Sequence, residues 1–330
     1  MVNTDHFSNE IIRRGRVRFT VFTPTYNRAY TIEKLYESLK RQTFHSFEWI
    51  VIDDGSTDNT GQLIKQWITQ QRSFKISYCF VEHGGKHRAI NKALESAQGD
   101  LFLIVDSDDY LTDDALSIMD SVEKSISKQS KSEFCAISGC DGYSSEERVG
   151  KTIKEGTGKN KRWLDITNLQ RAQYGLNFDR AVAYYTRILR QYPFPEYEGE
   201  TFITEAVVWD KMAHDGYKQR LFDAIIKIIN YLPDGLTAKG IQIFEDNPIG
   251  WALYIQQSIE YGRLKGMNRQ KEVLRYFVRT KKKFSFGDIA ANLRISPLRL
   301  LFWICTAKLN SCFRSINHKL KKVLKILASW

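Results

Sequence analysis

Three carboxylates follow one apolar segment of this chain. The segment Phe102 to Val105 reads Phe-Leu-Ile-Val, and Asp106, Asp108 and Asp109 come directly after it. Such a run predicts a strand buried on both faces, and alternate side chains of extended backbone share a face. We therefore expect Asp106 and Asp108 to point the same way. Crowded carboxylates repel one another, and a hard Mg2+ or Mn2+ ion with oxygen ligands removes that repulsion. The structural alternative is a strand end followed by the acidic start of a helix at Thr112–Asp114.

The elements that must position these carboxylates alternate between strand and helix over the first 140 residues. Repeated β-α-β units imply a mostly parallel sheet with helices on both sides, an α/β fold. Ligands of such sheets gather at the carboxyl ends of the strands. Strands are expected at 16–23, 47–52, 75–81, 101–105 and 134–138, and helices at 31–42, about 56–70, 86–98 and 112–128.

Polar residues follow each of the first four expected strands. Besides the aspartates, Tyr26 offers a flat ring, and Lys86 adds a positive charge after two glycines at a helix start, which suits a phosphate. His83 and His87 are left out, because a carboxylate cation site does not require them. The four strand-end segments are Thr23-Pro24-Thr25-Tyr26-Asn27-Arg28, Asp53-Asp54-Gly55-Ser56, Glu82-His83-Gly84-Gly85-Lys86 and Asp106-Ser107-Asp108-Asp109.

The net charge of +11 over 330 residues is unevenly distributed. Residues 261–330 hold 17 Lys or Arg against Glu272 and Asp288, a balance of +15, so the first 260 residues carry about −4. This asymmetry predicts an anionic partner for the C-terminal segment alone. Five scattered cysteines, no apolar leader and no run of about 18 apolar residues predict reduced thiols and a cytoplasmic location without a membrane span.

The second half of the chain is less regular. Residues 141–175 predict an exposed loop or a mobile lid. We expect a domain of residues 1–260, with a nucleotide-binding half at about 16–140 and an acceptor half at about 175–260, followed by a basic helical region at 261–330. Further strands are expected at 181–186 and 223–231, and further helices at 204–214 and 247–261.

These residues together resemble the nucleotide-sugar glycosyltransferases of family 2, which have the GT-A fold. The matching segments are FTPTYNRAYTIEKLYESLKRQTFHSFEWIVIDDGSTDNT, then GGKHRAINKALESAQGDLFLIVDSDDYL, and more loosely GETFITEAVVW at 199–209. The resemblance implies a metal-dependent, inverting transferase with a nucleoside-diphosphate sugar donor, for which a UDP-sugar is expected. It also implies a saccharide or lipid-linked acceptor in cell-surface polysaccharide or glycan synthesis.

The resemblance assigns a role to each strand-end residue. Asp106 then holds the ribose or a metal-bound water, and Lys86 meets the diphosphate. The base contacts expected are Tyr26 and Asp54, and Pro24 is expected to shape the same turn of the donor-nucleotide site. The metal ligands expected in the DxD-type site are Asp108 and Asp109.

The family also places a carboxylate base on the acceptor side, at a helix start. Glu205, which precedes Ala-Val-Val-Trp, fits that loose pattern best, and Glu200 is the other candidate. A carboxylate near neutral pH can accept the proton of an attacking hydroxyl. The structural alternative for Glu205 is a first-turn helix carboxylate. Trp209 either lines the acceptor site or packs in the core.

The basic C-terminal region leaves two interpretations open. Residues 320–327 place Leu320, Val323, Leu324 and Leu327 near one helical face, which predicts peripheral contact with an anionic membrane surface. A helical subdomain packed on the core is equally compatible with this pattern.

Two other functions are compatible with parts of the chain. A nucleotidyltransferase could use a similar sheet, but such enzymes usually have a glycine-rich loop with an arginine after the first strand. Residues 288–299 have a helix–turn–helix rhythm that would suit a nucleic-acid-binding protein. That function leaves the polar strand ends unexplained, so no nucleic-acid partner is expected.

Overall fold

The computed structural model describes residues 16–71 and 73–309. The chain divides into two compact units, Met1–Gly240 and Ile241–Trp330. The expected boundary at residue 260 lies 20 residues further along. The difference is α10 (Pro248–Glu260), whose buried Trp251 and Ile255 belong to a hydrophobic cluster of the second unit.

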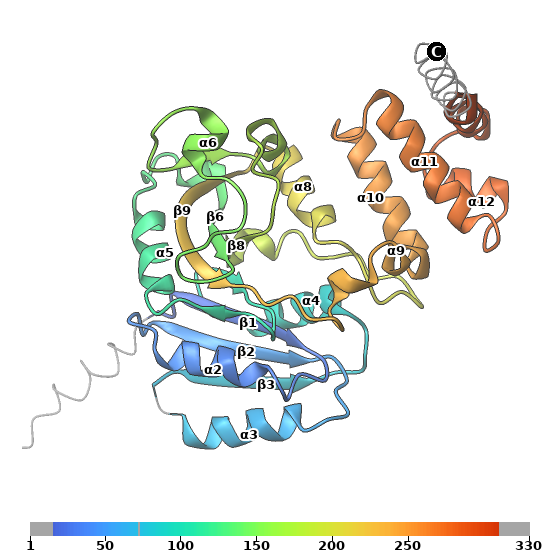
Figure 1. The fold of residues 1–330 in the computed structure, drawn as a ribbon. Helices are drawn as coiled ribbons and strands as arrows, with labels where there is room; N and C mark the ends of the chain where they lie inside the picture. The colour runs from blue at the N-terminus through green and yellow to red at the C-terminus, as the bar shows by residue number, and fades with distance from the viewer. Residues whose placement is uncertain (1–15, 72, 310–330) are drawn as a thin grey trace, which may run out of the picture. The chain divides into compact units, whose positions relative to one another are not determined.

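The first four strands form a parallel sheet, as predicted, and their order is β3-β2-β1-β4. Figure 1 shows β3, β2 and β1 side by side. All seven residues of β2 are buried, which explains its apolar segment Trp49–Ile52. The crossover helices α2, α3 and α4 link these strands, and α4 contacts β1 and β2. The bounds are β1 (Phe19–Thr25), α2 (Ile32–Lys40), β2 (Phe47–Asp53), α3 (Thr60–Gln70), β3 (Lys75–Phe80), α4 (Lys86–Ser96) and β4 (Leu101–Ile104).

The remaining strands make the sheet mixed. β8 lies antiparallel between β4 and β6, β9 lies parallel to β6, and β5 and β7 pair antiparallel with β9. The predicted α/β sheet flanked by helices is confirmed, with parallel pairs from β3 to β4 and between β6 and β9. The antiparallel pairs of β8, β5 and β7 were not predicted, because periodicity predicts a strand but not the direction of its partner. The bounds are β5 (Tyr110–Leu111), α5 (Ala115–Lys124), η1 (Lys131–Glu133), β6 (Phe134–Gly142), β7 (Leu164–Ile166), β8 (Arg180–Tyr185), α7 (Thr186–Leu189), α8 (Ala206–His214), β9 (Lys218–Ile228) and η3 (Leu236–Lys239).

Residues 141–175, expected as a loop or lid, contain packed structure. Ile153 in α6 (Ile153–Thr157) and Leu164 in β7 are buried in one cluster with Leu221. Thr152 and Glu155 form a capping box at the start of α6, and a short 3-10 helix, η2 (Asn168–Tyr174), follows β7. The polar composition of this segment hid the few apolar residues that anchor it.

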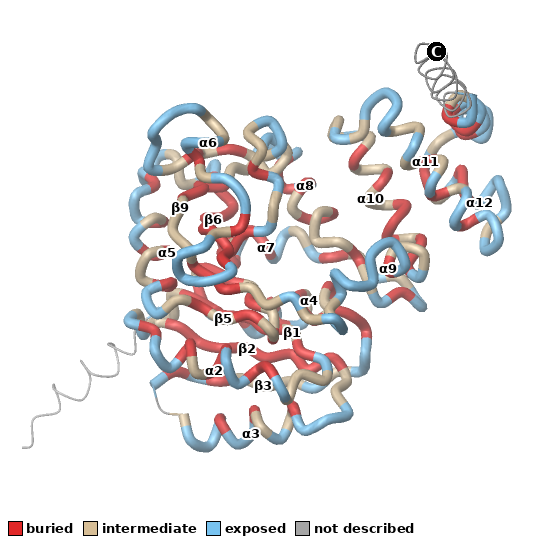
Figure 2. The backbone as a smooth tube through the Cα atoms, viewed as in Figure 1, coloured by how far each residue is buried: buried red, intermediate tan, exposed pale blue. Residues whose placement is uncertain are grey.

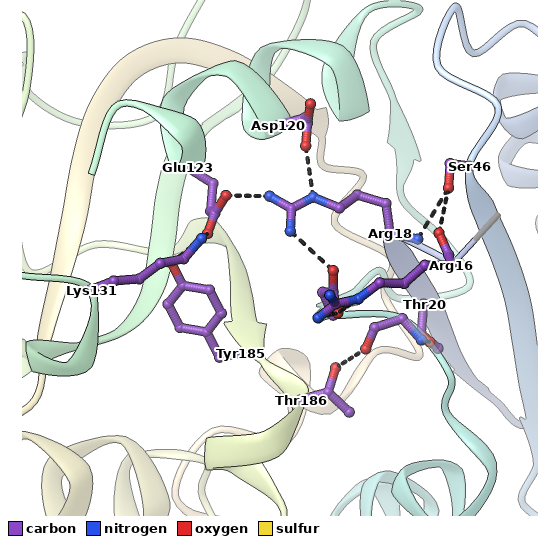
Figure 3. A network of polar contacts seen from close by, with 11 residues as sticks. Arg16, Arg18, Thr20, Ser46, Asp120, Glu123, Lys131, Tyr185 and Thr186 are labelled. Atoms are coloured by element: carbon purple, nitrogen blue, oxygen red, sulfur yellow. Dashed lines mark hydrogen bonds and ion pairs between the residues drawn. The ribbon is translucent and has the colours of Figure 1, made fainter. Parts of the chain in front are cut away.

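A polar network stabilises the starts of the strands, at the end of β1 opposite to the polar strand ends (Figure 3). Arg18 pairs with Asp100, Asp120 and Glu123. Glu123 is fully buried and also bonds Lys131 and the Tyr185 hydroxyl. Burial by itself would lower the pKa of Arg18, but these carboxylates raise it well above its ordinary value. The network ties β1, α5 and β8 together and leaves the other rim of the sheet for ligands.

The second unit is helical and has its own core. Trp251, Tyr276, Ile289 and Trp303 are buried in that core. Figure 2 shows buried stretches along α10. Within the described residues, no helix is long and apolar enough to span a membrane. The amphipathic pattern predicted at 320–327 lies outside the described residues. The helices are α9 (Gln242–Asp246), α10, α11 (Gly266–Thr280), α12 (Phe286–Asn292) and residues 297–309.

Candidate active site

The three aspartates after β4 lie in a turn. β4 ends at Ile104, and the Asp109 N–H donates to the Asp106 carbonyl oxygen at 3.1 Å. The expectation that Asp106 and Asp108 share a face because the backbone is extended is therefore wrong. The apolar strand ends before the first carboxylate, and the turn gives each aspartate different neighbours.

Lys86 joins residues from three separate motifs. Its Nζ lies 2.7 Å from Oδ1 of Asp106 and 3.0 Å from Oε1 of Glu205. Burial by itself would lower the pKa of Lys86, but Asp106 and Glu205 raise it well above its ordinary value. The ammonium group therefore stays charged and links the strand-end aspartates to the helix start at Glu205.

The loops that carry Lys86 and Glu205 approach each other closely. Gly85 has φ +95°, and a Cβ at this position would lie 1.7 Å from the Thr201 carbonyl oxygen. Only glycine fits this contact without a shift of the backbone. The Gly84-Gly85 pair, which is common in ordinary turns, therefore has a specific role in bringing the start of α4 against the segment before α8.

Glu205 precedes α8 but makes no side-chain cap bond to it. Its carboxylate faces Lys86 instead, so capping of α8 does not explain its orientation. The Glu205 side chain is 32% exposed, whereas Glu200 is only 5% exposed. Glu205 is thus the more accessible of the two candidates. Trp209 stacks on Tyr184 with ring centroids 4.1 Å apart, which favours the packing alternative for this residue.

Asp109 is held by residues from β9 and the segment that follows. Its Oδ2 lies 2.9 Å from Lys227 Nζ, and its Oδ1 accepts the Asn230 N–H at 3.1 Å. Burial raises the pKa of Asp109, and the positive charge of Lys227 opposes this shift without cancelling it. Lys227 Nζ also lies 3.6 Å from the fully buried Asp141, and burial raises the pKa of Asp141 to about 6.

Lys227 and Asp141 were missed by the sequence reasoning. The available signal was one lysine inside the apolar run FDAIIKI and one aspartate at the end of another buried strand. A charged residue at a buried strand position is rare unless it is paired.

Asp108 is the least compensated carboxylate of the three. Among the described residues it has no lysine partner like those of Asp106 and Asp109. Burial, with Asp109 and Asp106 next, raises the pKa of Asp108 to about 6. A cation near this group would relieve that repulsion.

The aspartates alone do not form a metal cage. In the part of the chain that the structure describes, no group of three or more His, Cys, Asp or Glu residues is placed to hold a metal ion. Asp108 fits a cation, but both oxygens of Asp109 are already engaged. A metal at this turn would therefore take further oxygen ligands from a bound substrate.

Tyr26 and Asp54 lie with His83 at the ends of β1, β2 and β3. The rings of Tyr26 and His83 stack at 4.6 Å, and Tyr26 is 44% exposed, so it is not a buried packing residue. The Asp54 carboxylate accepts N–H bonds from Gly84 at 2.7 Å and Gly85 at 2.9 Å, and lies 2.9 Å from His83 Nδ1. In this structure Asp54 fixes the Gly84-Gly85 turn. His83, left out above, joins the expected base contacts.

Pro24 lies inside β1 and not in the turn after it. It pairs with Ile52 of β2 on one side of β1, whereas on the opposite side the β1–β4 register has already ended at Phe22 and Ile104. The missing N–H of proline therefore costs no ladder bond on that side.

The segment after β9 is fixed at both ends. Asn230 bonds Asp109, and Asp234 pairs with Arg28 Nη1 at 2.7 Å and accepts from the Tyr30 hydroxyl at 2.9 Å. We call residues 230–234 the strap. It runs from the aspartate turn to the segment after β1, so it borders the same rim. Its contacts join residues between 121 and 206 positions apart, which no local pattern reveals.

Comparisons with known proteins agree with this arrangement. Residues 20–162 match the model of the family described as glycosyl transferase family 2. The poly(ribitol-phosphate) beta-N-acetylglucosaminyltransferase TarS of Staphylococcus aureus is 38% identical over 102 residues, which are 30% of this chain and 18% of TarS. The putative teichuronic acid biosynthesis glycosyltransferase TuaG of Bacillus subtilis is 37% identical over 97 residues, 29% of this chain and 38% of TuaG. These matches thus span well under half of either relative.

Solved structures extend the likeness beyond the matched segment. TarS residues 1–349 of S. aureus with UDP-GlcNAc has a TM-score of 0.57 at 19% identity, over 88% of this chain and 79% of that one. The mannosyltransferase PcManGT of Pyrobaculum calidifontis with GDP-Man and Mn2+ has a TM-score of 0.51 at 20% identity, over 96% and 81%. At these identities the likeness shows the fold. Residues 20–162 thus match glycosyl transferase family 2, and the fold is that of the GT-A glycosyltransferases among the solved structures.

Proposed function

We propose that this chain transfers a sugar from a nucleoside-diphosphate sugar, with a UDP-sugar as the expected donor, to a saccharide or lipid-linked acceptor. The observation that carries the proposal is the contact of Lys86 with both Asp106 and Glu205. Lys86, which is expected at the diphosphate, thereby lies between Asp106, which is expected at the donor, and Glu205, the expected base. The names of TarS and TuaG support cell-surface polymer synthesis as the setting.

The proposed reaction inverts the anomeric centre. Glu205 accepts the proton of the acceptor hydroxyl, whose oxygen attacks the anomeric carbon from the face opposite the departing diphosphate. The bond from the anomeric carbon to the diphosphate oxygen breaks as the new glycosidic bond forms. Lys86 orients Glu205 before the acceptor binds and contributes positive charge near the leaving group. Tyr26 and His83 offer their stacked rings to the base, with Asp54 and Pro24 shaping that end of the site.

Mg2+ or Mn2+ is the proposed cofactor. Asp108 is the ligand that the geometry favours, and Asp109 holds the turn through Lys227 while remaining the second candidate ligand. A bound cation would supply charge neutralisation for the departing nucleoside diphosphate.

The test is a comparison of the two glutamates. Glu205→Gln should keep UDP-dependent thermal stabilisation but lower turnover of a UDP-sugar by about a hundredfold or more, the usual effect of losing a general base. Glu200→Gln, the matched control, should change turnover far less. Normal rates for Glu205→Gln would reject the assigned role. If no UDP-, GDP- or CMP-linked ligand shifts the melting temperature with or without Mn2+, the donor proposal fails.

We also propose that the protein is cytoplasmic and contacts an anionic membrane surface peripherally. The support is the balance of +15 over residues 261–330. Such contact would bring the enzyme to a lipid-linked acceptor.

A further inference from the structure

The helix of residues 297–309 is apolar on two sides. It begins after Ser296, whose hydroxyl accepts the Arg299 N–H at 3.3 Å, and Pro297 occupies its first position. One side packs into the core of the second unit through Leu300, Trp303 and Ile304, all at most 5% exposed. The helix is thus anchored in its unit by one face, and its remaining side chains form the opposite face.

That other face is an exposed apolar ridge. Leu298 is 81% exposed, Phe302 61%, Leu309 58% and Leu301 49%, and Cys305 between them is also exposed. Positions 298, 301, 302, 305 and 309 follow the 3.6-residue period, so they lie along one side. A surface helix normally places polar residues there, and a contiguous exposed apolar patch marks an interaction site.

The surroundings of the exposed ridge are cationic. Arg294, Arg299 and Lys308 are exposed beside it, and the chain has no Asp or Glu after Asp288. Over residues 241–309 there are 12 Lys or Arg against five Asp or Glu. Arg299 lies 4.8 Å from the centroid of the Trp303 ring, so its charge is held at the helix surface.

This combination of residues selects one kind of partner. A second copy of the chain would bring an equally positive unit against this one, which like-charge repulsion disfavours. Nucleic acid would require polar side chains on the exposed face of the second helix of a helix–turn–helix, but that face here carries Leu298, Leu301 and Phe302. An anionic lipid surface accepts both features, because apolar side chains enter the acyl region while arginine and lysine meet the head groups.

We propose that the exposed ridge inserts into an anionic lipid bilayer and forms the membrane-contacting face of the second unit. The inference deepens the peripheral membrane contact proposed above and rests on it for the partner, but not on the transferase activity. The proposal assigns the membrane contact to the helix of residues 297–309 and assigns no role to residues 310–330.

The test uses the full-length chain and vesicles of phosphatidylcholine with and without phosphatidylglycerol. The double variant Leu301→Ser, Phe302→Ser should lose at least about tenfold of its partitioning to the anionic vesicles, since each large apolar side chain that becomes buried contributes about tenfold or more. Val278→Ser is the matched control, because Val278 is 47% exposed on α11 and lies outside the exposed ridge. It should bind within about twofold of the unchanged chain.

The outcomes separate the alternatives. Binding that depends on phosphatidylglycerol and on the exposed ridge supports the proposal. Equal vesicle binding by the double variant overturns it and leaves the contact to other residues. A dimer in solution that the double variant abolishes would make a second copy the occupant and also overturns it. The UDP thermal shift of each variant reports on folding and on the donor proposal alone, so failure of one proposal is distinguishable from failure of the other.

Discussion

Replacement of Lys227 by methionine should destabilise the rim of the sheet strongly. Lys227 Nζ lies 2.9 Å from Asp109 and 3.6 Å from Asp141, and Asp141 is fully buried with neither carboxylate oxygen hydrogen-bonded. Methionine fills a similar volume but removes the only lysine shown to pair with these two groups among the described residues. Removing one partner of a buried ion pair typically costs about 3–5 kcal/mol, because the remaining charge stays uncompensated.

The pH dependence gives this prediction its sign. Burial raises the pKa of Asp141 to about 6 from an ordinary 3.8, so the folded state binds a proton more tightly than the unfolded state does. Such a group opposes folding by about 3 kcal/mol above pH 6, and this penalty disappears as the pH falls toward 4. Without Lys227 the pKa of Asp141 should rise further. The destabilisation by Lys227→Met should therefore be largest at pH 8 and smallest near pH 5.

Hydrogen exchange of the β9 amides, measured by mass spectrometry on the full chain, reports on this unit without assuming two-state unfolding. The double variant Lys227→Met, Asp141→Asn should regain about 1–3 kcal/mol of the loss, since it removes one unpaired charge. A loss under about 1 kcal/mol for Lys227→Met, or a loss independent of pH between 5 and 8, would refute the reasoning.

Three further predictions follow from the geometry of the rim. Binding of Mn2+ in the presence of UDP, measured by calorimetry, should weaken about tenfold per pH unit below about 6, because the pKa of Asp108 is raised to about 6 and a proton competes with the cation; equal affinity at pH 7.5 and pH 5 would contradict this role. Gly85→Ala should lower the free energy of unfolding by more than about 2 kcal/mol, because its Cβ would meet the Thr201 carbonyl. Gly158→Ala, also at positive φ but with open space around it, should lower it by only about 1–2 kcal/mol in the same thermal unfolding experiment. Similar losses for both would show that the close contact is unimportant. Asp234→Asn should weaken the strap and speed tryptic cleavage at the exposed Lys239 by up to about fivefold, since Asp234 is more than half exposed and its pair is worth at most about 1 kcal/mol; an unchanged cleavage rate would mean that Arg28 does not hold the strap.

The sequence by itself determined the parallel half of the sheet. The strand patterns of β1, β2 and β3, each followed by a polar turn and then an amphipathic helix, are local signals. Such signals can be read from the sequence, because the periodicity of a strand or a helix involves neighbouring residues only. The same local signals place Lys86 at the start of a helix and Asp108 after a buried strand, whereas Glu205 was proposed from the resemblance to family 2.

Only the tertiary structure decided which of these residues meet. Lys86 and Glu205 are separated by 119 positions, and Lys227 and Asp109 by 118, so no pattern along the chain could pair them. The antiparallel insertion of β8 between β4 and β6 brings β9, and with it Lys227, to the rim that the parallel strands form. Burial and neighbouring charges then give each aspartate a different chemistry. Asp106 is an ion-pair partner, Asp141 is a buried acid with a pKa of about 6, and Asp108 is a candidate cation ligand. They differ because each turn or strand end sets a different distance to the nearest lysine.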